Sequence, residues 1–129
     1  MAPDVKLGRV EIVFQYVGVD DRVVRFLLNQ GNLDGLVLAG SGIGNFSRAN
    51  GFAEAIEEVR AKGIPVVLCS RVPTGRVIPL YGGKGRGVHA KQIGCVLDDN
   101  LGPLKARILL MLAMTKTKDP NELQKYFDR

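Results

Sequence analysis

Side chains that could carry chemistry are few and scattered in this chain of 129 residues. Its single histidine, His89, lies in a glycine- and lysine-rich stretch, where a solvated surface residue is the simplest interpretation. Nucleophilic catalysis needs a hydroxyl or thiol beside a base that a third group orients, and the chain has no Gly-x-Ser-x-Gly elbow. The available hydroxyls are more simply turn or cap residues: Ser41, Ser47, Ser70 and Thr74. We therefore expect no catalytic residue in this chain.

Acidic residues and cysteines do not form a metal-binding or redox pattern either. The adjacent pairs at 20–21 and 98–99 precede predicted helices, where capping explains them without acid–base chemistry. Cys69 and Cys95 each lie in an apolar, strand-like stretch with no nearby histidine. We interpret both as buried thiols, and a single disulfide between neighbouring strands is the alternative. No metal and no cofactor is expected.

A glycine-rich loop superficially has the form of a nucleotide-binding loop. The pattern Gly40-x-Gly42-x-Gly44 lacks the final spacing of a dinucleotide-binding loop, and the segment 46–51 delays the helix that would direct its N-terminus at a pyrophosphate. The chain also has no Gly-Lys-Ser or Gly-Lys-Thr sequence. Nucleotide binding is therefore not favoured.

Charge is distributed unevenly along a chain whose net charge is +5. Residues 1–70 carry seven Lys and Arg against eight Asp and Glu, whereas residues 71–129 carry eleven against five. The cations of the second segment are spread out and have no interleaved aromatic residues on which bases could stack, so a solvated face is favoured over a nucleic-acid surface. The longest apolar run, 108–114, is far too short to cross a bilayer. We expect neither a nucleic-acid nor a membrane partner.

Short β-rich runs alternate with helical patterns along the chain. Strands are expected at 9–16, 35–39, 64–69 and 93–97, and helices after the acids 20–21 up to Gly31, from Phe52 to Lys62, over 104–115 and over 121–127. The helix over 104–115 is apolar nearly all the way round, so we expect it to be enclosed on several sides. The stretch 70–87 is expected to be a long mobile connection.

This alternation requires right-handed β-α-β crossovers and a sheet covered on both faces. We predict a single α/β domain over residues 1–129, a flavodoxin-like three-layer domain with a four-stranded, mainly parallel sheet and flanking helices. Ligands of such sheets bind beyond the carboxyl ends of the strands, which here lead into the loops 41–45, 70–75 and 98–100.

Five segments then follow one another in a specific order: Ala39–Asn45, Gly63–Val67, Ser70–Gly75, Leu104–Ala113 and Thr117–Pro120. Together, from about Gly8 to Phe127, they resemble the carboxy-terminal domain of bacterial L-asparaginases. The resemblance implies an amidohydrolase that converts L-asparagine, and often L-glutamine more slowly, to the acid and ammonia. It also implies two α/β domains per subunit and a homo-oligomer, either a dimer or a tetramer of tight dimers.

In that family, the amino-terminal domain carries the nucleophilic threonine, a second threonine with its aspartate and lysine, and a flexible tyrosine loop. The carboxy-terminal domain completes the pocket of a neighbouring subunit. The resemblance thus implies that the amino-terminal catalytic domain is absent from these 129 residues and that the chain alone is inactive. Its expected partners are that domain, further copies of itself and a small-molecule amide substrate. Residues 1–6 have no signal-peptide pattern, which for a fragment says nothing about the compartment of the parent protein. The location is therefore left open, with the cytoplasm slightly favoured over the periplasm.

One pocket residue carries over from the family by resemblance. The family loop Gly-Asn-Gly-Asn is here Gly42-Ile43-Gly44-Asn45, so Asn45 aligns with the pocket asparagine that binds substrate, while Ile43 replaces the earlier asparagine. The alternative is an asparagine tolerated in a left-handed turn. The family's acidic pocket position falls within 80–86, which contains no carboxylate, and the preference between the two amides is left open.

Two other functions compete with this interpretation. The basic glycine loop 82–87 would suit a standalone binding module for a phosphorylated or nucleic-acid ligand, whose affinity would fall steeply with salt. A pure assembly domain without any ligand is the third possibility.

Overall fold

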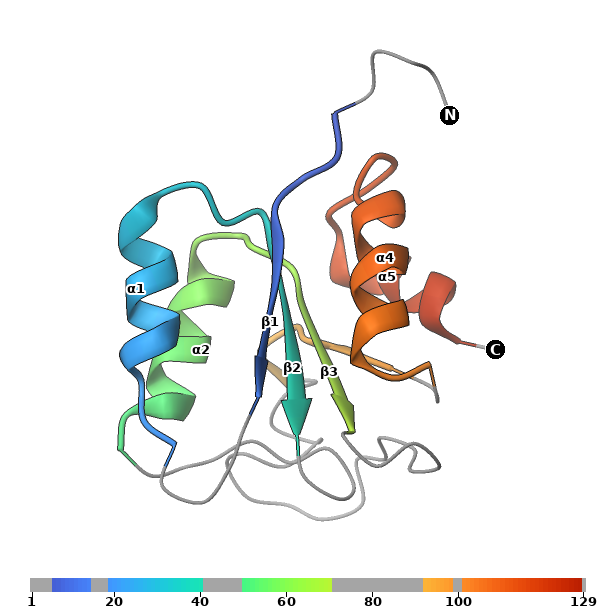
Figure 1. Ribbon diagram of the computed structural model, residues 1–129. Coiled ribbons are helices and arrows are strands. Elements are labelled where there is room, and N and C mark those ends of the chain that lie inside the picture. Colours follow the sequence, from blue (N-terminus) through green and yellow to red (C-terminus); the bar gives the residue numbers. More distant parts are fainter. Residues whose placement is uncertain (1–5, 15–18, 41–49, 71–91, 99–100, 129) are drawn as a thin grey trace.

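A four-stranded parallel sheet forms the middle layer of the molecule (Figure 1). The computed structural model describes residues 6–14, 19–40, 50–70, 92–98 and 101–128. The strands are β1 (Val10–Phe14), β2 (Gly35–Gly40), β3 (Val66–Ser70) and β4 (Val96–Leu97), and they lie in the order β1-β2-β3-β4. The predicted fold class is therefore confirmed.

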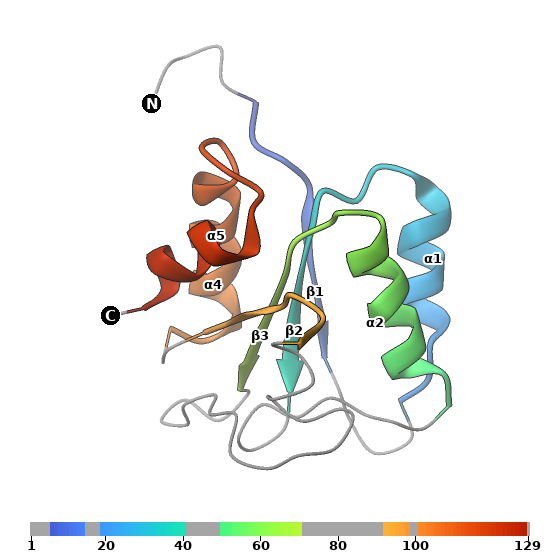
Figure 2. The same cartoon turned by 180° about the vertical axis from the view of Figure 1, so that it is seen from behind.

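Helices cover both faces of the sheet (Figures 1 and 2). Because successive right-handed crossovers each move one strand along, α1 (Arg22–Gln30) and α2 (Phe52–Ala61) lie on the same face. The other face is covered by α4 (Pro103–Ala113) and α5 (Pro120–Phe127). Side chains of β2 alternate between the two cores: Leu36 and Leu38 belong to the α1/α2 core, and Val37 belongs to the α4/α5 core.

Local sequence signals determine most helix boundaries. Gly31 ends α1 in a left-handed conformation (φ 76°), which costs little at glycine. The Asp119 carboxylate accepts from the Glu122 N–H at 3.0 Å, and Pro120 follows as the first residue of α5. The apolar residues of α2 that recur at helical spacing in the sequence are all fully buried: Phe52, Ala55, Ile56 and Val59.

The fourth strand is much shorter than predicted. A strand was expected over 93–97, but only Val96 and Leu97 pair with β3. Gly94 has a φ of +91°, and a Cβ there would lie 2.9 Å from the guanidinium of Arg60, so the backbone turns at this point. The same Arg60 side chain donates to the carbonyls of Ile93 and Ile64 at 3.1 and 3.0 Å, which fixes the turn.

The expected enclosure of α4 is wrong for its outer side. Leu104, Ile108 and Leu112 are 72, 56 and 43% exposed, although they follow one another at four-residue intervals along the helix. The inner side of α4 is buried against the sheet through Ala106, Leu110 and Ala113. Only one side of the helix meets the sheet and α5, so its apolar outer row remains at the surface.

Both cysteines are buried thiols outside any disulfide, as predicted. Cys69 belongs to the α4/α5 core and Cys95 to the α1/α2 core, on opposite faces of the sheet. The register pairs Val67 with Val96, so Cys69 lies three residues further along the sheet than Cys95, or roughly 10 Å. A disulfide needs Cα atoms within about 7 Å, so the two thiols cannot be bridged in this fold. Among the described helices, none combines the length and apolar character needed to cross a membrane.

Candidate functional site at the carboxyl end of the sheet

The predicted ligand-binding loops begin where β2, β3 and β4 end, at the carboxyl edge of the parallel sheet. The register aligns Gly40 at the end of β2 with Ser70 at the end of β3. At the next strand, the Asp98 N–H donates to the Leu68 carbonyl at 3.0 Å. Ligands of parallel α/β sheets bind beyond this edge, so the structure brings together the roots of the three predicted loops.

The predicted substrate-binding residue, Asn45, lies in the segment 41–49, outside the described residues. Its role therefore stays a prediction. The other candidates outside the described residues are Ser41, Ser47, Thr74 and His89, together with the carboxylate-free stretch 80–86 and the basic loop 82–87. Of the predicted connection 70–87, only Ser70 is described, as the last residue of β3.

Asn50 and Gly51, which follow the segment 41–49 and precede α2, are held against the start of α1. Asn50 has a positive φ of 59°, and its side-chain amide donates to the Val19 carbonyl at 3.3 Å. Gly51 is also left-handed (φ 78°), and a Cβ there would lie 3.0 Å from an oxygen of Asp21. Two consecutive left-handed residues packed against the start of α1 thus define one end of the segment, and Gly40 defines the other.

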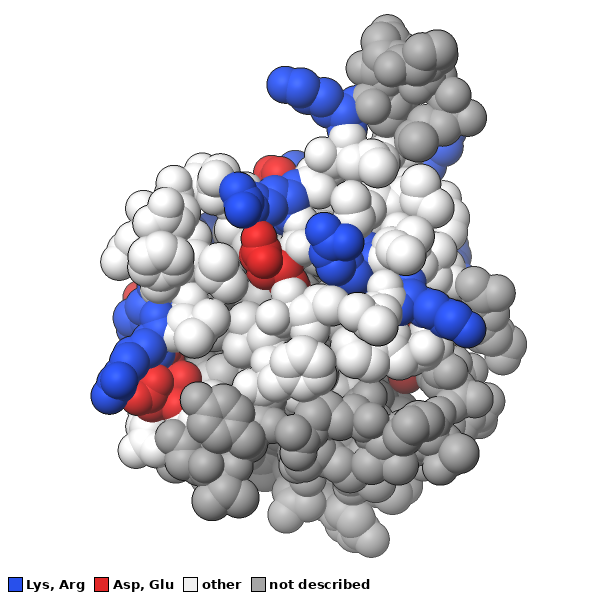
Figure 3. Space-filling model, in the orientation of Figure 1, with Lys and Arg blue, Asp and Glu red and all other residues white. Residues whose placement is uncertain are grey.

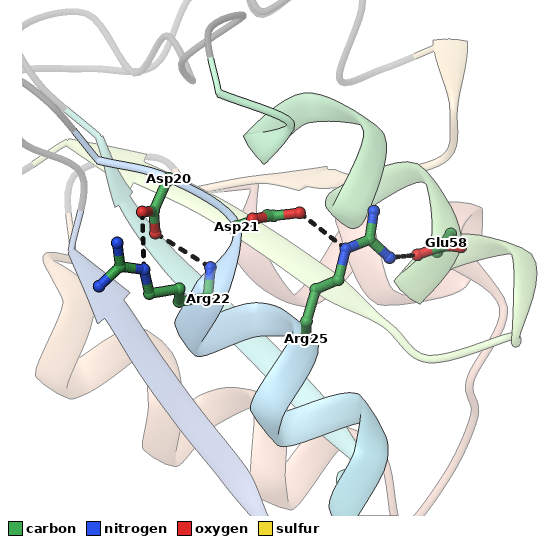
Figure 4. A network of polar contacts seen from close by, with 5 residues as sticks. All are labelled: Asp20, Asp21, Arg22, Arg25 and Glu58. Atoms are coloured by element: carbon green, nitrogen blue, oxygen red, sulfur yellow. Dashed lines mark hydrogen bonds and ion pairs between the residues drawn. The ribbon is translucent and has the colours of Figure 1, made fainter.

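An ion-pair network ties the start of α1 to α2 (Figure 4). Arg25 bonds the Asp21 carboxylate at 2.8 Å and also pairs with Glu58 of α2. The hydrogen bond from Arg25 lowers the pKa of Asp21, and the bonds to Asp21 and Glu58 raise the pKa of Arg25. Asp21 is the N-cap residue of α1, but its side chain makes no capping hydrogen bond and is used in the ion pair instead. Asp20, one residue earlier, accepts from the Arg22 N–H at 3.1 Å.

Asp98 is a buried carboxylate at this edge, only 3% exposed. Its oxygens accept from the N–H groups of Leu101 and Gly102 at 3.0–3.2 Å, so it holds the chain just before α4. Asp98 does not cap the helix as predicted, because the N-cap residue of α4 is Gly102, which has no side-chain capping bond. Burial, and secondarily the charge of Asp98, raise the pKa of the Cys69 thiol to about 12. The thiol is therefore protonated at neutral pH and is not poised as a nucleophile.

Two polar side chains that sequence reasoning missed hold the outer strands. The Gln124 amide accepts from the Leu97 N–H at 2.8 Å and donates to the Leu97 carbonyl at 2.9 Å. Arg107 donates to the Val10 carbonyl at 2.7 Å. These partners are 27 and 97 residues apart in sequence, so no local pattern could have identified them.

No group of three potential metal ligands occurs among the described residues. A groove of about 270 Å³ lies at the opposite end of the sheet, where the chain enters β1, and it contains none of the predicted site residues. Its lining includes Lys6, Leu7, Asp34, Met111 and Met114.

Comparisons with known proteins agree with the arrangement of the sheet and its helices. Residues 9–127 match the family described as the Glutaminase/Asparaginase C-terminal domain. The chain is 38% identical over 122 residues to a probable periplasmic L-asparaginase of Haemophilus influenzae, covering 95% of this chain and 33% of that protein. It is 36% identical over 124 residues to L-asparaginase 2 of Escherichia coli, covering 96 and 33%.

A solved structure gives the same result. The crystal structure of a probable cytoplasmic L-asparaginase from Campylobacter jejuni superimposes with a TM-score of 0.81 at 34% identity, covering 97% of this chain and 38% of that one. The chain therefore spans about a third of the length of the relatives it matches.

Proposed function

The chain belongs to the glutaminase/asparaginase C-terminal domain family, and on that premise we propose that it is the carboxy-terminal domain of an L-asparaginase, an amidohydrolase that forms L-aspartate and ammonia from L-asparagine. The observation that carries the proposal is the family match over residues 9–127. The relatives named as L-asparaginases support the substrate, because they match nearly the whole of this chain.

The proposed division of labour assigns the nucleophile to an amino-terminal domain and Asn45 to substrate binding in a neighbouring subunit's pocket. An asparagine side chain both donates and accepts hydrogen bonds, which suits an amide substrate or a pocket residue that holds it. The fixed ends of the segment, at Gly40 and at Asn50 and Gly51, support this role, because a binding loop needs rigid anchors.

The proposed partners are the amino-terminal domain and further copies of the protein. The exposed apolar row on α4 supports this, because a helix that is apolar on all sides is normally enclosed on all sides. Residues 1–129 would then form one domain of a larger subunit that works as a dimer or tetramer. We keep the cytoplasm as the proposed location; one relative is named as periplasmic and another as cytoplasmic.

An ammonia-release assay with L-asparagine tests the proposal. We expect no turnover by the chain alone, and turnover when the chain is joined to an L-asparaginase amino-terminal domain. In the joined protein, Asn45→Ala should lower kcat/KM by about tenfold or more, because a hydrogen bond to the substrate amide is lost. Asn121→Ala, at an exposed position on α5, is the matched control.

Two results would contradict the proposal. Turnover by the chain alone above a heat-killed control would mean that it contains its own nucleophile. An Asn45→Ala variant that behaves like Asn121→Ala would remove Asn45 from the pocket.

A further inference from the structure

The outer edge of β4 is closed by a side chain instead of a strand. β4 has only two residues, and it pairs with β3 on one side. The Asp98 N–H points toward β3, where it donates to Leu68, so the N–H and carbonyl of the preceding residue, Leu97, point away from the sheet. Both of these groups bond to the amide of Gln124, at 2.8 and 2.9 Å.

The geometry points to Gln124 as a positioning residue that stands in for a fifth strand and holds the end of β4, and with it Asp98, at the ligand-binding edge of the sheet. A neighbouring strand would offer one carbonyl and one N–H to Leu97, and a primary amide offers the same acceptor and donor. Leu123 and Phe127, one residue before and three after, are fully buried and fix α5 against the sheet.

Asp98 connects this clamp to the candidate site. Its backbone N–H bonds to β3, and its buried carboxylate holds the turn into α4. A shift of Leu97 would therefore displace Asp98 and the end of β4, from which one of the predicted pocket loops begins. This last step, from strand position to substrate binding, rests on the proposed function; the clamp itself does not.

A carboxyl group at position 124 would test the donor and acceptor requirement directly. In its ionised form it can only accept, so the Leu97 carbonyl loses its donor and faces a negative charge. Two further carboxylates lie close: Asp128, which accepts from the Gln124 amide at 2.9 Å, and Asp98, the residue after Leu97. The cationic residues of the neighbouring helix α4 are Lys105, which is exposed, and Arg107, whose guanidinium bonds the Val10 carbonyl. Protonation would restore an O–H donor and hence the clamp.

The experiment compares Gln124→Glu and Gln124→Leu with Asn121→Asp, which makes the same amide-to-acid change at an exposed position of α5. The readout is the protection factor of the Leu97 amide against hydrogen exchange, at pH 7 and pH 5. At pH 7 we expect Gln124→Leu to lose about tenfold in protection, because the Leu97 N–H loses its acceptor, and Asn121→Asp to lose none. Gln124→Glu should lose less, because its carboxylate still accepts from the Leu97 N–H while it repels the Leu97 carbonyl. As the pH falls to 5, Gln124→Glu should recover part of its loss, because a growing fraction of the introduced carboxyl group is protonated and can donate to the Leu97 carbonyl, and Gln124→Leu should recover none.

Two results would overturn the clamp: unchanged Leu97 protection in both variants, or equal losses in Gln124→Glu and Gln124→Leu at both pH values. The step to the pocket is tested in the joined two-domain protein, where Gln124→Leu should raise KM several-fold with kcat within about twofold. An unchanged KM overturns that step and leaves the proposed function intact. An unmodified joined protein that does not hydrolyse asparagine overturns the proposed function, whereas the exchange result on the clamp stands.

Discussion

The two outer strands of the sheet, β1 and β4, have their free sides completed in different ways. At the β4 side, Gln124 bonds both outward groups of Leu97, and α5 seals the core beneath with Leu123 and Phe127. At the β1 side, Arg107 bonds a single carbonyl, that of Val10, and Phe14 at the end of the strand is 48% exposed.

Apolar side chains flank the β1 side on two helices. They are Val23 and Phe26 on α1 and Leu104, Ile108 and Leu112 on α4. Figure 3 shows this side of the molecule: uncharged surface fills the centre of the view, and charged side chains lie above and beside it. Among the described residues, the chain thus completes the β4 side of the sheet with its own side chains, whereas exposed apolar side chains lie beside β1.

The largest expected effect separates the two sides by stability. Phe127→Ala removes a fully buried ring at the β4 side and should lower the free energy of unfolding by about 3–5 kcal/mol. Phe26→Ala, on the exposed outer side of α1, should change it by no more than about 0.5 kcal/mol. Urea denaturation of both variants checks this. Similar losses would show that the Phe26 ring contributes to a core in solution.

A smaller effect is expected on assembly. Ile108→Glu places a charge in the α4 row and should weaken self-association of the joined two-domain protein by about tenfold or more, because burying that side chain contributes about 1.5–3 kcal/mol. Tyr126→Glu, at an exposed aromatic of α5 on the β4 side, should leave association unchanged. Sedimentation equilibrium distinguishes the two. If Tyr126→Glu has the stronger effect, the β1 side is not the interface.

The smallest effect concerns the ion pair at the start of α1. The pKa of Asp21 is lowered in the folded protein by its hydrogen bond with Arg25, so its contribution to stability is present above its ordinary value of 3.8 and is lost as pH falls through the folded value. Asp21→Asn should therefore flatten the loss of stability in acid and change little at high salt, because the pair is exposed. Thermal unfolding between pH 7 and pH 3 measures this. An unchanged acid slope would mean that the pair is not formed in solution.

Much of the fold could be predicted because its signals are local. The glycine after α1, the Asp-Pro start of α5 and the 3.6-residue periodicity of α2 each act within a few residues. The fourth strand was predicted to be too long because the backbone turns at Gly94, where the side chain of Arg60 bonds the Ile93 carbonyl. No periodicity in the sequence reports this long-range contact. The outer row of α4 was correctly identified as apolar, but its predicted enclosure was wrong, because the row lies on the side of the helix that faces away from the sheet.

Of the candidate site, too, one part could be predicted from the sequence and another could not. Its location at the carboxyl edge followed from strand direction alone, and the structure brings Gly40, Ser70 and Asp98 to that edge. Gln124 could not be foreseen, since its role depends on contact with a strand 27 residues away. The substrate-binding role of Asn45 rests on the family resemblance and stays a prediction.

The order of the strands also has a consequence for synthesis. Every strand and both helices of the first face precede α4 and α5 in the chain, so a growing polypeptide can cover only one face of the sheet until its last segment has emerged from the ribosome. The second core would then close after translation, and a premature stop before residue 120 would remove the seal of that core and the clamp on β4 together. We expect proteases to degrade such truncated chains, because their second core is open.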